Sequence, residues 1–297
     1  MKESALAYSE RFVIALRRTA ASVIMIGGDA MNARISLALA VLSLPAPITL
    51  AQTFLITQGS TLYRYSGSSI QTFALPSEVT GLTVVPAGYS AGSLNGGAQP
   101  GDVFAVANGN SGNIAYRLDN PLTTPSLTQV GVMGGGGNNS PCFANGKLYG
   151  VLLGVNFLEY NTASLAANNT WYTGVFGGSG GLVHDSGNNF LFVEGLTDSL
   201  YTYSPGGTAS LVGSLAINFE NSSMEAYGGL VYAALGRVDT GKLELGTVST
   251  MSGIFSPIAV IDNYWGGSLG LTVVPAPASA ALLSCSALCV LRRRRPA

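Results

Sequence analysis

Between residues 52 and 274 the chain alternates short apolar runs with clusters of glycine, asparagine and serine. The runs are rich in aromatic and β-branched residues, and none keeps the 3.6-residue period of an amphipathic helix. This pattern predicts an all-β domain without a helix. The clearest predicted strands are Thr53–Thr57, Thr61–Tyr65, Asp102–Val106, Lys147–Val151, Phe190–Val193 and Leu230–Ala234.

Two strand patterns recur along this region at a nearly constant spacing. The first pattern has its second residue at intervals of 53, 43, 42 and 43, at Tyr63, Tyr116, Glu159, Tyr201 and Glu244. The second pattern has an aromatic residue at intervals of 45, 43 and 40, at Phe104, Tyr149, Phe192 and Tyr232. Repeats of this length are typical of propeller blades or solenoid turns.

Five repeats with four short strands each predict a five-bladed β-propeller. Phe54 precedes Tyr63 by 9 positions, as in the second pattern, whereas the last repeat ends near Val274 without such a strand. We therefore expect the N-terminal strand to complete the last blade and close the ring, which removes exposed sheet edges. A β-sandwich or a β-solenoid is the alternative architecture, because strand counts alone fit both.

Three local features fit the repeats. The wide first interval contains Ala87–Pro100, a low-complexity insertion that we expect to form a mobile surface loop. The hexapeptide Gly81–Pro86 returns as Gly270–Pro275, at matching places in the first and last repeats. Gly181–Asn188 resembles the turn that links two strands of a propeller blade.

The N-terminal part of the chain contains an export signal. Met31–Arg34 is a short basic segment, Ile35–Leu50 is apolar, and small residues precede a cleavage point between Ala51 and Gln52. This order predicts a signal peptide over residues 31–51, read by the general secretion machinery.

Residues 1–30 are then an upstream extension, with Met31 as the start of the protein. The alternative keeps Met1 and takes Arg17–Thr19 as a twin-arginine signal with Ala20–Gly28 as its apolar core. That core is short and mixed in composition, which favours the first interpretation.

The C-terminal segment 275–297 joins a proline motif, an apolar run and a basic cluster. The motif is Pro275, Ala276 and Pro277, the run is the fourteen residues Ala278–Leu291, and the cluster is Arg292, Arg293, Arg294 and Arg295. The run is shorter than the roughly 20 residues of a permanent membrane-spanning helix, and the arginines would hold its end on the cytoplasmic side. The segment resembles the PEP-CTERM sorting signal of bacteria with exosortases, with Ala276 where that motif has glutamate.

The resemblance implies a route and a partner. Such proteins are exported, held in the inner membrane by the C-terminal helix, cleaved near the motif by an exosortase, and delivered to the cell surface or an exopolysaccharide matrix. We therefore expect an exported protein whose domain, residues 52–274, reaches the cell surface or extracellular matrix.

Charge and cysteine content exclude several classes of function. The domain holds five basic residues against twelve acidic ones, a net charge of minus seven. Nucleic acid is not an expected partner, because a phosphate backbone requires clustered cations. Cys142 is the one cysteine of the domain and is expected to be a small buried apolar residue, since His184 is the one other soft ligand. We expect no metal and no cofactor.

Catalytic residues are sparse. The motif around His184 supplies no partner for nucleophilic or metal chemistry, so a structural or solvent-exposed role is expected for this residue. Glu159 and Glu244 lie in the first strand pattern, which we expect nearest the propeller axis, and would form an acid–base pair if suitably separated. Twelve acids over five blades make such a coincidence ordinary, so the protein is not expected to be an enzyme.

Aromatic residues are the stronger candidates for ligand binding. Trp171, Tyr172, Tyr264 and Trp265 are flanked by asparagine and glycine, a context that suits sugar rings or a protein surface. Packing between blades is the simpler interpretation. The sequence thus predicts a non-enzymatic envelope or matrix protein with a structural or adhesive role, and a glycan-binding or glycan-cleaving propeller is the alternative, with exopolysaccharide as its candidate partner.

Overall fold

The computed structural model describes residues 52–274, apart from residues 90–93, 95–96, 110–111, 136–138, 153–154, 176–179 and 186–188. The predicted upstream extension and the signal peptide with Ala51 lie outside the described residues. So does the sorting segment, with its predicted motif residues Pro275, Ala276, Pro277, Arg292, Arg293, Arg294 and Arg295. The assignments of these segments therefore stay predictions from the sequence.

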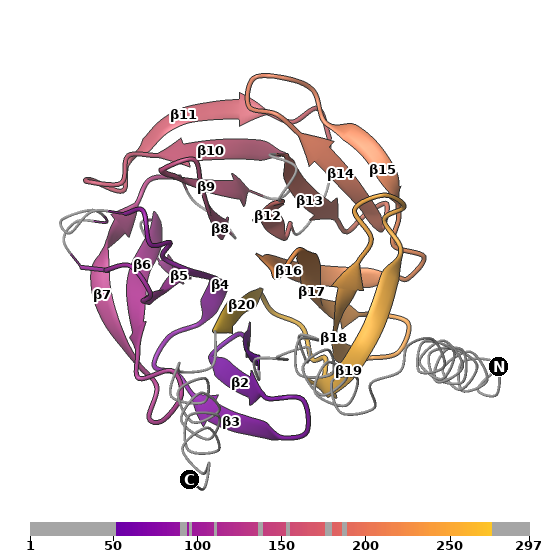
Figure 1. The fold of residues 1–297 in the computed structure, drawn as a ribbon, viewed down its shortest axis with the longest axis horizontal. Coiled ribbons are helices and arrows are strands. Elements are labelled where there is room, and N and C mark those ends of the chain that lie inside the picture. The colour runs from indigo at the N-terminus through magenta and orange to yellow at the C-terminus, as the bar shows by residue number, and fades with distance from the viewer. Residues whose placement is uncertain are drawn as a thin grey trace, which may run out of the picture. The chain divides into compact units, whose positions relative to one another are not determined.

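The described residues form five four-stranded antiparallel sheets arranged as the blades of a propeller (Figure 1). In chain order of their first strands, blade II is β4–β7, blade III is β8–β11, blade IV is β12–β15 and blade V is β16–β19. Blade I has the order β20-β1-β2-β3. The predicted five-bladed propeller is confirmed, and no helix interrupts the strands within the described part of the chain.

Each blade places four strands from the axis outward. The innermost strands are β20 (Leu269–Val274), β4 (Val79–Val84), β8 (Asn139–Ala144), β12 (Leu182–His184) and β16 (Phe219–Tyr227). The second strands are β1 (Thr53–Gln58), β5 (Val103–Gly109), β9 (Lys147–Leu152), β13 (Phe190–Glu194) and β17 (Leu230–Arg237). The third strands are β2 (Thr61–Tyr65), β6 (Gly112–Asp119), β10 (Asn156–Tyr160), β14 (Ser199–Tyr203) and β18 (Lys242–Val248). The outer strands are β3 (Ile70–Ala74), β7 (Ser126–Met133), β11 (Ala167–Tyr172), β15 (Ser210–Ser214) and β19 (Phe255–Asn263).

The N-terminal strand closes the ring. Strand β1 pairs with β2 on one side and with the C-terminal strand β20 on the other, and Thr53 lies opposite Val274. The predicted closure is therefore confirmed. It joins the two ends of the domain by a six-residue ladder and gives β1 a partner on both sides.

The core is divided among the junctions between blades. Five clusters of buried apolar side chains each combine residues of two neighbouring blades. Outer strands such as β3 and β11 are largely exposed, whereas β13 is buried along its whole length. The aromatic residues of the second pattern, Phe104, Tyr149, Phe192 and Tyr232, are buried in second strands because two blades enclose them.

The innermost strands, which converge near the axis, carry the buried hydroxyl residues Thr80, Ser140, Ser222, Ser223 and Thr272. Their hydroxyls link the blades. Ser223 of β16 accepts a hydrogen bond from the backbone N–H of Leu271 in β20 (2.9 Å), and Ser222 accepts one from Gly181 (3.0 Å). Gly270 lets β20 lie close to β1 and β4, since a Cβ there would lie 2.5 Å from Thr57 Oγ1 and 3.0 Å from Leu82 Cγ.

This arrangement corrects one prediction from the sequence. The first strand pattern, which contains Glu159 and Glu244, forms third strands and does not lie nearest the axis. Both glutamates are buried within these third strands. The hexapeptides that begin at Gly81 and Gly270 instead supply adjacent innermost strands, β4 and β20.

The insertion Ala87–Pro100 is also more than a surface loop. Of its described residues, Tyr89, Leu94 and Ala98 are buried and belong to the core between blades II and III. The prediction of a mobile surface loop overlooked these apolar anchors, because the glycines and serines around them dominate the composition of the segment.

Candidate functional site

Both ends of the domain lie at one face of the propeller. In every blade the innermost strand runs toward this face, and four of them turn there into the second strand, while β20 ends there at Val274 opposite Thr53. We call this the terminal face, and the opposite one the far face. The chain segments before Gln52 and after Val274 are attached at the terminal face.

A depression of about 420 Å³ opens at the terminal face where blades II, III and IV meet. Tyr89 from the β4–β5 connection, Phe143 and Asn145 from the β8–β9 hairpin, and His184 at the end of β12 border it. The Tyr89 and Phe143 rings meet edge to face at 4.7 Å, and His184 packs in the same way on Phe190 at 4.9 Å. We call it the three-blade pocket.

Cys142 lies beneath this pocket and is buried, as predicted. Its sulfur donates a 3.9 Å hydrogen bond to the carbonyl oxygen of Phe143, and its side chain shares a buried cluster with Leu182 and Phe190 of blade IV. Burial and the nearby Glu225 carboxyl raise the pKa of the Cys142 thiol, so it stays protonated and unreactive at neutral pH.

Glu225 of β16 is the most perturbed carboxyl group among the described residues. Its Oε2 accepts a 2.9 Å hydrogen bond from Thr272 Oγ1 of β20, across the junction of blades V and I. Protein surrounds the carboxyl group, although part of the residue stays accessible to water, and this burial raises its pKa from 4.5 to about 8. Glu225 is thus mainly protonated at neutral pH.

Glu159 and Glu244 do not form an acid–base pair. They lie in blades III and V, and each is held by a cation of its own blade: Lys147 Nζ lies 2.8 Å from Glu159, and Arg237 Nη1 lies 3.0 Å from Glu244. Burial would raise the pKa of Glu159, but the hydrogen bonds from Lys147 and from Asn168 outweigh it and hold that pKa below its usual value. Both carboxylates are structural in this geometry.

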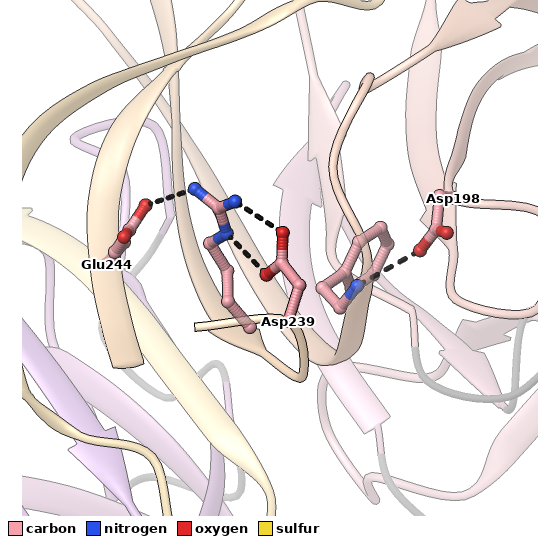
Figure 2. A network of polar contacts seen from close by, with 5 residues as sticks. Asp198, Asp239 and Glu244 are labelled. Atoms are coloured by element: carbon pink, nitrogen blue, oxygen red, sulfur yellow. Dashed lines mark hydrogen bonds and ion pairs between the residues drawn. The ribbon is translucent and has the colours of Figure 1, made fainter. Parts of the chain in front are cut away.

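The cation of Glu244 belongs to a network at the far face (Figure 2). Arg237 binds Asp239 through Nε (3.0 Å) and Nη2 (2.6 Å), and its Nη1 reaches Glu244. Asp198 of the neighbouring blade accepts a 3.0 Å hydrogen bond from the backbone N–H of Phe219. These contacts fix the turn between β17 and β18 and the entry to β16, and they leave no carboxylate of the network without a donor.

The structure places the four predicted aromatic residues in different surroundings. Trp171 is half-buried between blades III and IV, 6.2 Å from the Phe157 ring, whereas Tyr172 beside it is 51% exposed. Tyr264 is half-buried and accepts a 2.6 Å hydrogen bond from Asn221. Trp265 is 58% exposed and lies over Gly59 at the far face. Trp171 and Tyr172 come from blade III and the other two from the loop between blades V and I, so they form two separate groups.

These surroundings predict different effects of truncation. Trp171→Ala should lower the free energy of unfolding by about 3 kcal/mol because it removes a ring from an inter-blade core. Trp265→Ala should cost about 1 kcal/mol or less, since most of that side chain is already in water. Urea unfolding of the two variants measures the difference, and equal losses would contradict the placement of Trp265 at the surface.

The residues that the sequence did not single out are Tyr89, Phe143 and Glu225. Tyr89 was hidden within a low-complexity segment, and Phe143 lies beside Cys142 without a motif. Glu225 carried one available signal: it is the single carboxylate within the Ser222–Ala226 part of an innermost strand, among uncharged residues.

Comparisons with known proteins give no family for this chain. No protein family and no curated protein matches it. Among solved structures, it is similar to a protein of unknown function from Bacteroides thetaiotaomicron (13% identity, 73% of this chain and 69% of that one, TM-score 0.44). It is also similar to virginiamycin B lyase from Staphylococcus aureus (12%, 71% and 71%, TM-score 0.39) and to Myxococcus xanthus glutaminyl cyclase (15%, 69% and 74%, TM-score 0.38).

Two absences hold for the part of the chain that the structure describes. No group of three or more histidine, cysteine, aspartate or glutamate side chains is placed to bind a metal ion there. Within the same residues, no helix has the length and apolar character needed to cross a bilayer.

Proposed function

We propose that this protein is exported, sorted by an exosortase, and displayed at the cell surface or in the extracellular matrix as a non-enzymatic component with a structural or adhesive role. The PEP-CTERM-like segment and the signal peptide supply the route. The matrix exopolysaccharide is the partner that an adhesive role requires.

One structural observation carries the proposal. Strand β1 begins at Thr53, directly after the predicted cleavage point, and β20 ends at Val274, directly before Pro275. Removal of both terminal segments would therefore leave the twenty described strands and the five inter-blade cores intact. A domain whose described strands all lie between the two processing points keeps each of them after release.

The sorting step is tested by changing the cluster Arg292–Arg295. In an exosortase-bearing host, the intact chain should yield a product of about residues 52–275 outside the inner membrane. A variant with serine in place of Arg292, Arg293, Arg294 and Arg295 should keep its C-terminal segment and stay membrane-bound. Intact-mass spectrometry of fractionated cells measures both. Replacement of the four arginines by lysine is the matched control and should restore release if positive charge is the feature that matters.

A product that keeps its C-terminus in the inner membrane in all three cases would contradict the sorting proposal. The protein would then be a membrane-tethered propeller, and Ala276 in place of glutamate would be the first difference to examine. Ala276→Glu would test that explanation directly.

A glycan-binding propeller is the second candidate. The exposed Tyr172 and Trp265 rings support it, since a sugar ring can pack its apolar face on such a side chain. Glycan cleavage has less support, because Glu159 and Glu244 lie in separate blades and are each paired with a cation.

A further inference from the structure

We propose that the three-blade pocket is a binding site for a neutral, hydroxyl-rich ring, such as a neutral hexose unit of a polysaccharide. This inference rests on the proposed adhesive function and names the ligand class and the site. It assigns the binding to residues other than Trp171, Tyr172, Tyr264 and Trp265.

Unpaired polar atoms are the first observation. Tyr89 is 8% exposed, yet its hydroxyl has no hydrogen-bond partner among the described residues, and the same is true of His184 Nε2. A buried polar group without a partner costs about 1–3 kcal/mol, and native proteins seldom keep two of them at one place. Both residues border the three-blade pocket, and the two atoms are shielded from its surface, so a bound molecule would satisfy both once the two side chains turn toward it.

The chemistry of the two atoms selects the ligand. Burial raises the pKa of Tyr89, so its hydroxyl stays protonated, while an imidazole nitrogen donates or accepts according to its tautomer. A ligand hydroxyl both donates and accepts, so vicinal hydroxyls of a sugar can serve Tyr89 and His184 in either tautomer. A carboxylate or phosphate would act as an acceptor alone.

The walls of the pocket agree with a neutral ring. Its described lining contains no lysine and no arginine, and the domain as a whole is acidic, so an anionic ligand has no counterion among these residues. The fixed edge-to-face pair of Tyr89 and Phe143 offers an aromatic surface for the apolar face of a sugar. Gly88 and Gly146 border the pocket without a side chain that would narrow it. Its volume of about 420 Å³ lies in the range of small-ligand sites.

The site is built on rigid parts of the propeller. Phe143 also packs against Phe104, a fully buried residue of β5, at 5.9 Å. Strand β12 packs against β8, since Leu182 shares a buried cluster with Cys142 and Ala144. The pocket is therefore positioned by three blades rather than by a single loop, which keeps the ordering cost of binding small.

Binding is tested on the domain of residues 52–274, which contains every described strand and inter-blade core. The probes are methyl glycosides of glucose, galactose, mannose and glucuronic acid, with saturation-transfer NMR for detection and calorimetry for affinity. At least one neutral glycoside should bind, and the glucuronide should bind more weakly. Tyr89→Phe and His184→Phe should each weaken binding about tenfold, the effect of one lost hydrogen bond of about 1.4 kcal/mol.

Two controls separate the site from the fold. Tyr65→Phe removes the hydroxyl of an equally buried tyrosine in blade I and should leave binding unchanged. The midpoint of thermal unfolding of Tyr89→Phe without ligand should be no lower than that of the unchanged domain, because the lost hydroxyl had no partner. A clear fall would show that it has a structural partner and would overturn the proposal.

Two binding results would also overturn it. One is a folded domain that binds none of the neutral glycosides at millimolar concentration. The other is binding that survives both Tyr89→Phe and His184→Phe but is lost in Trp265→Ala, which would move the site to the far face. Since these measurements use a domain without the terminal segments, they are independent of the outcome of the sorting experiment.

Discussion

A chain that ends at Ser268, and so lacks β20, should show no cooperative unfolding transition. The loss removes Leu269, Leu271 and Val273, all buried, at about 1.5–3 kcal/mol each. It also leaves the inner edge of β1 unpaired and opens the ring between blades I and V. The sum is comparable to the whole stability of a typical domain, about 5–15 kcal/mol.

Circular dichroism during urea unfolding measures this, and a chain that ends at Val274 is the matched control. It keeps β20 and should unfold in one transition. A point variant refines the test: Leu271→Ala, at a position 0% exposed, should cost about 3 kcal/mol, whereas Leu211→Ala on outer strand β15, 63% exposed, should cost about 0.5 kcal/mol or less. A cooperative transition in the chain that ends at Ser268 would show that β1 does not depend on its partner.

The closure of the ring could be predicted because the recurring strand patterns follow from how the strands pack between blades. Second and third strands are enclosed between blades, so they need aromatic and branched residues at a constant spacing, and the chain repeats them at Phe104, Tyr149, Phe192 and Tyr232. Phe54 fell in phase with this series, so its strand had to belong to a blade that the C-terminal end left incomplete. The pairing of Thr53 with Val274 confirms that step.

The position of strands relative to the axis could not be predicted in the same way. Innermost strands such as Val79–Val84 and Leu182–His184 share no aromatic residue at a constant spacing, so they carry a weaker periodic signal. The conspicuous first pattern was therefore placed nearest the axis, and Glu159 and Glu244 were assigned there with it. Their burial is real, but they lie in third strands and are paired with cations of the adjacent second strands.

The three-blade pocket could not be predicted from the sequence for a related reason. Its residues are spread over more than 90 positions, from Tyr89 to His184, and of these two only His184 stands in a motif, the segment Gly181–Asn188. The sequence shows neighbours along a blade, whereas this site exists because three blades converge at one face. Aromatic residues near turns, such as Trp265, can be recognised in the sequence, so the prediction of ligand-binding residues rested on them.

Glu225 gives the domain an expected pH dependence of stability. The carboxyl group binds a proton more tightly in the folded state, where its pKa is about 8, than in the unfolded chain, where the usual value of 4.5 applies. Its contribution to stability is therefore fully present below about pH 4.5 and is lost as the pH rises through 8. At about 1.4 kcal/mol for each pH unit, the loss is at most about 5 kcal/mol.

Glu225→Gln removes this dependence because an amide keeps the shape and cannot ionise. Its free energy of unfolding should exceed that of the unchanged protein by a few kcal/mol at pH 9, and the difference should shrink toward pH 5. Glu220→Gln, at an exposed position of the same strand, is the matched control and should leave the pH profile unchanged. Urea unfolding between pH 5 and 9 measures these proteins.

The hydroxyl of Thr272 allows a second test of the Glu225 pKa. Its hydrogen bond stabilises the ionised carboxylate and lowers the pKa of Glu225, so Thr272→Val should raise that pKa further and extend the loss of stability to higher pH. If the free energy of unfolding of Glu225→Gln changed with pH in parallel with that of the unchanged protein, the Glu225 carboxyl group would ionise equally well in the folded and unfolded states. The junction between blades V and I would then be held by its backbone contacts and apolar packing alone.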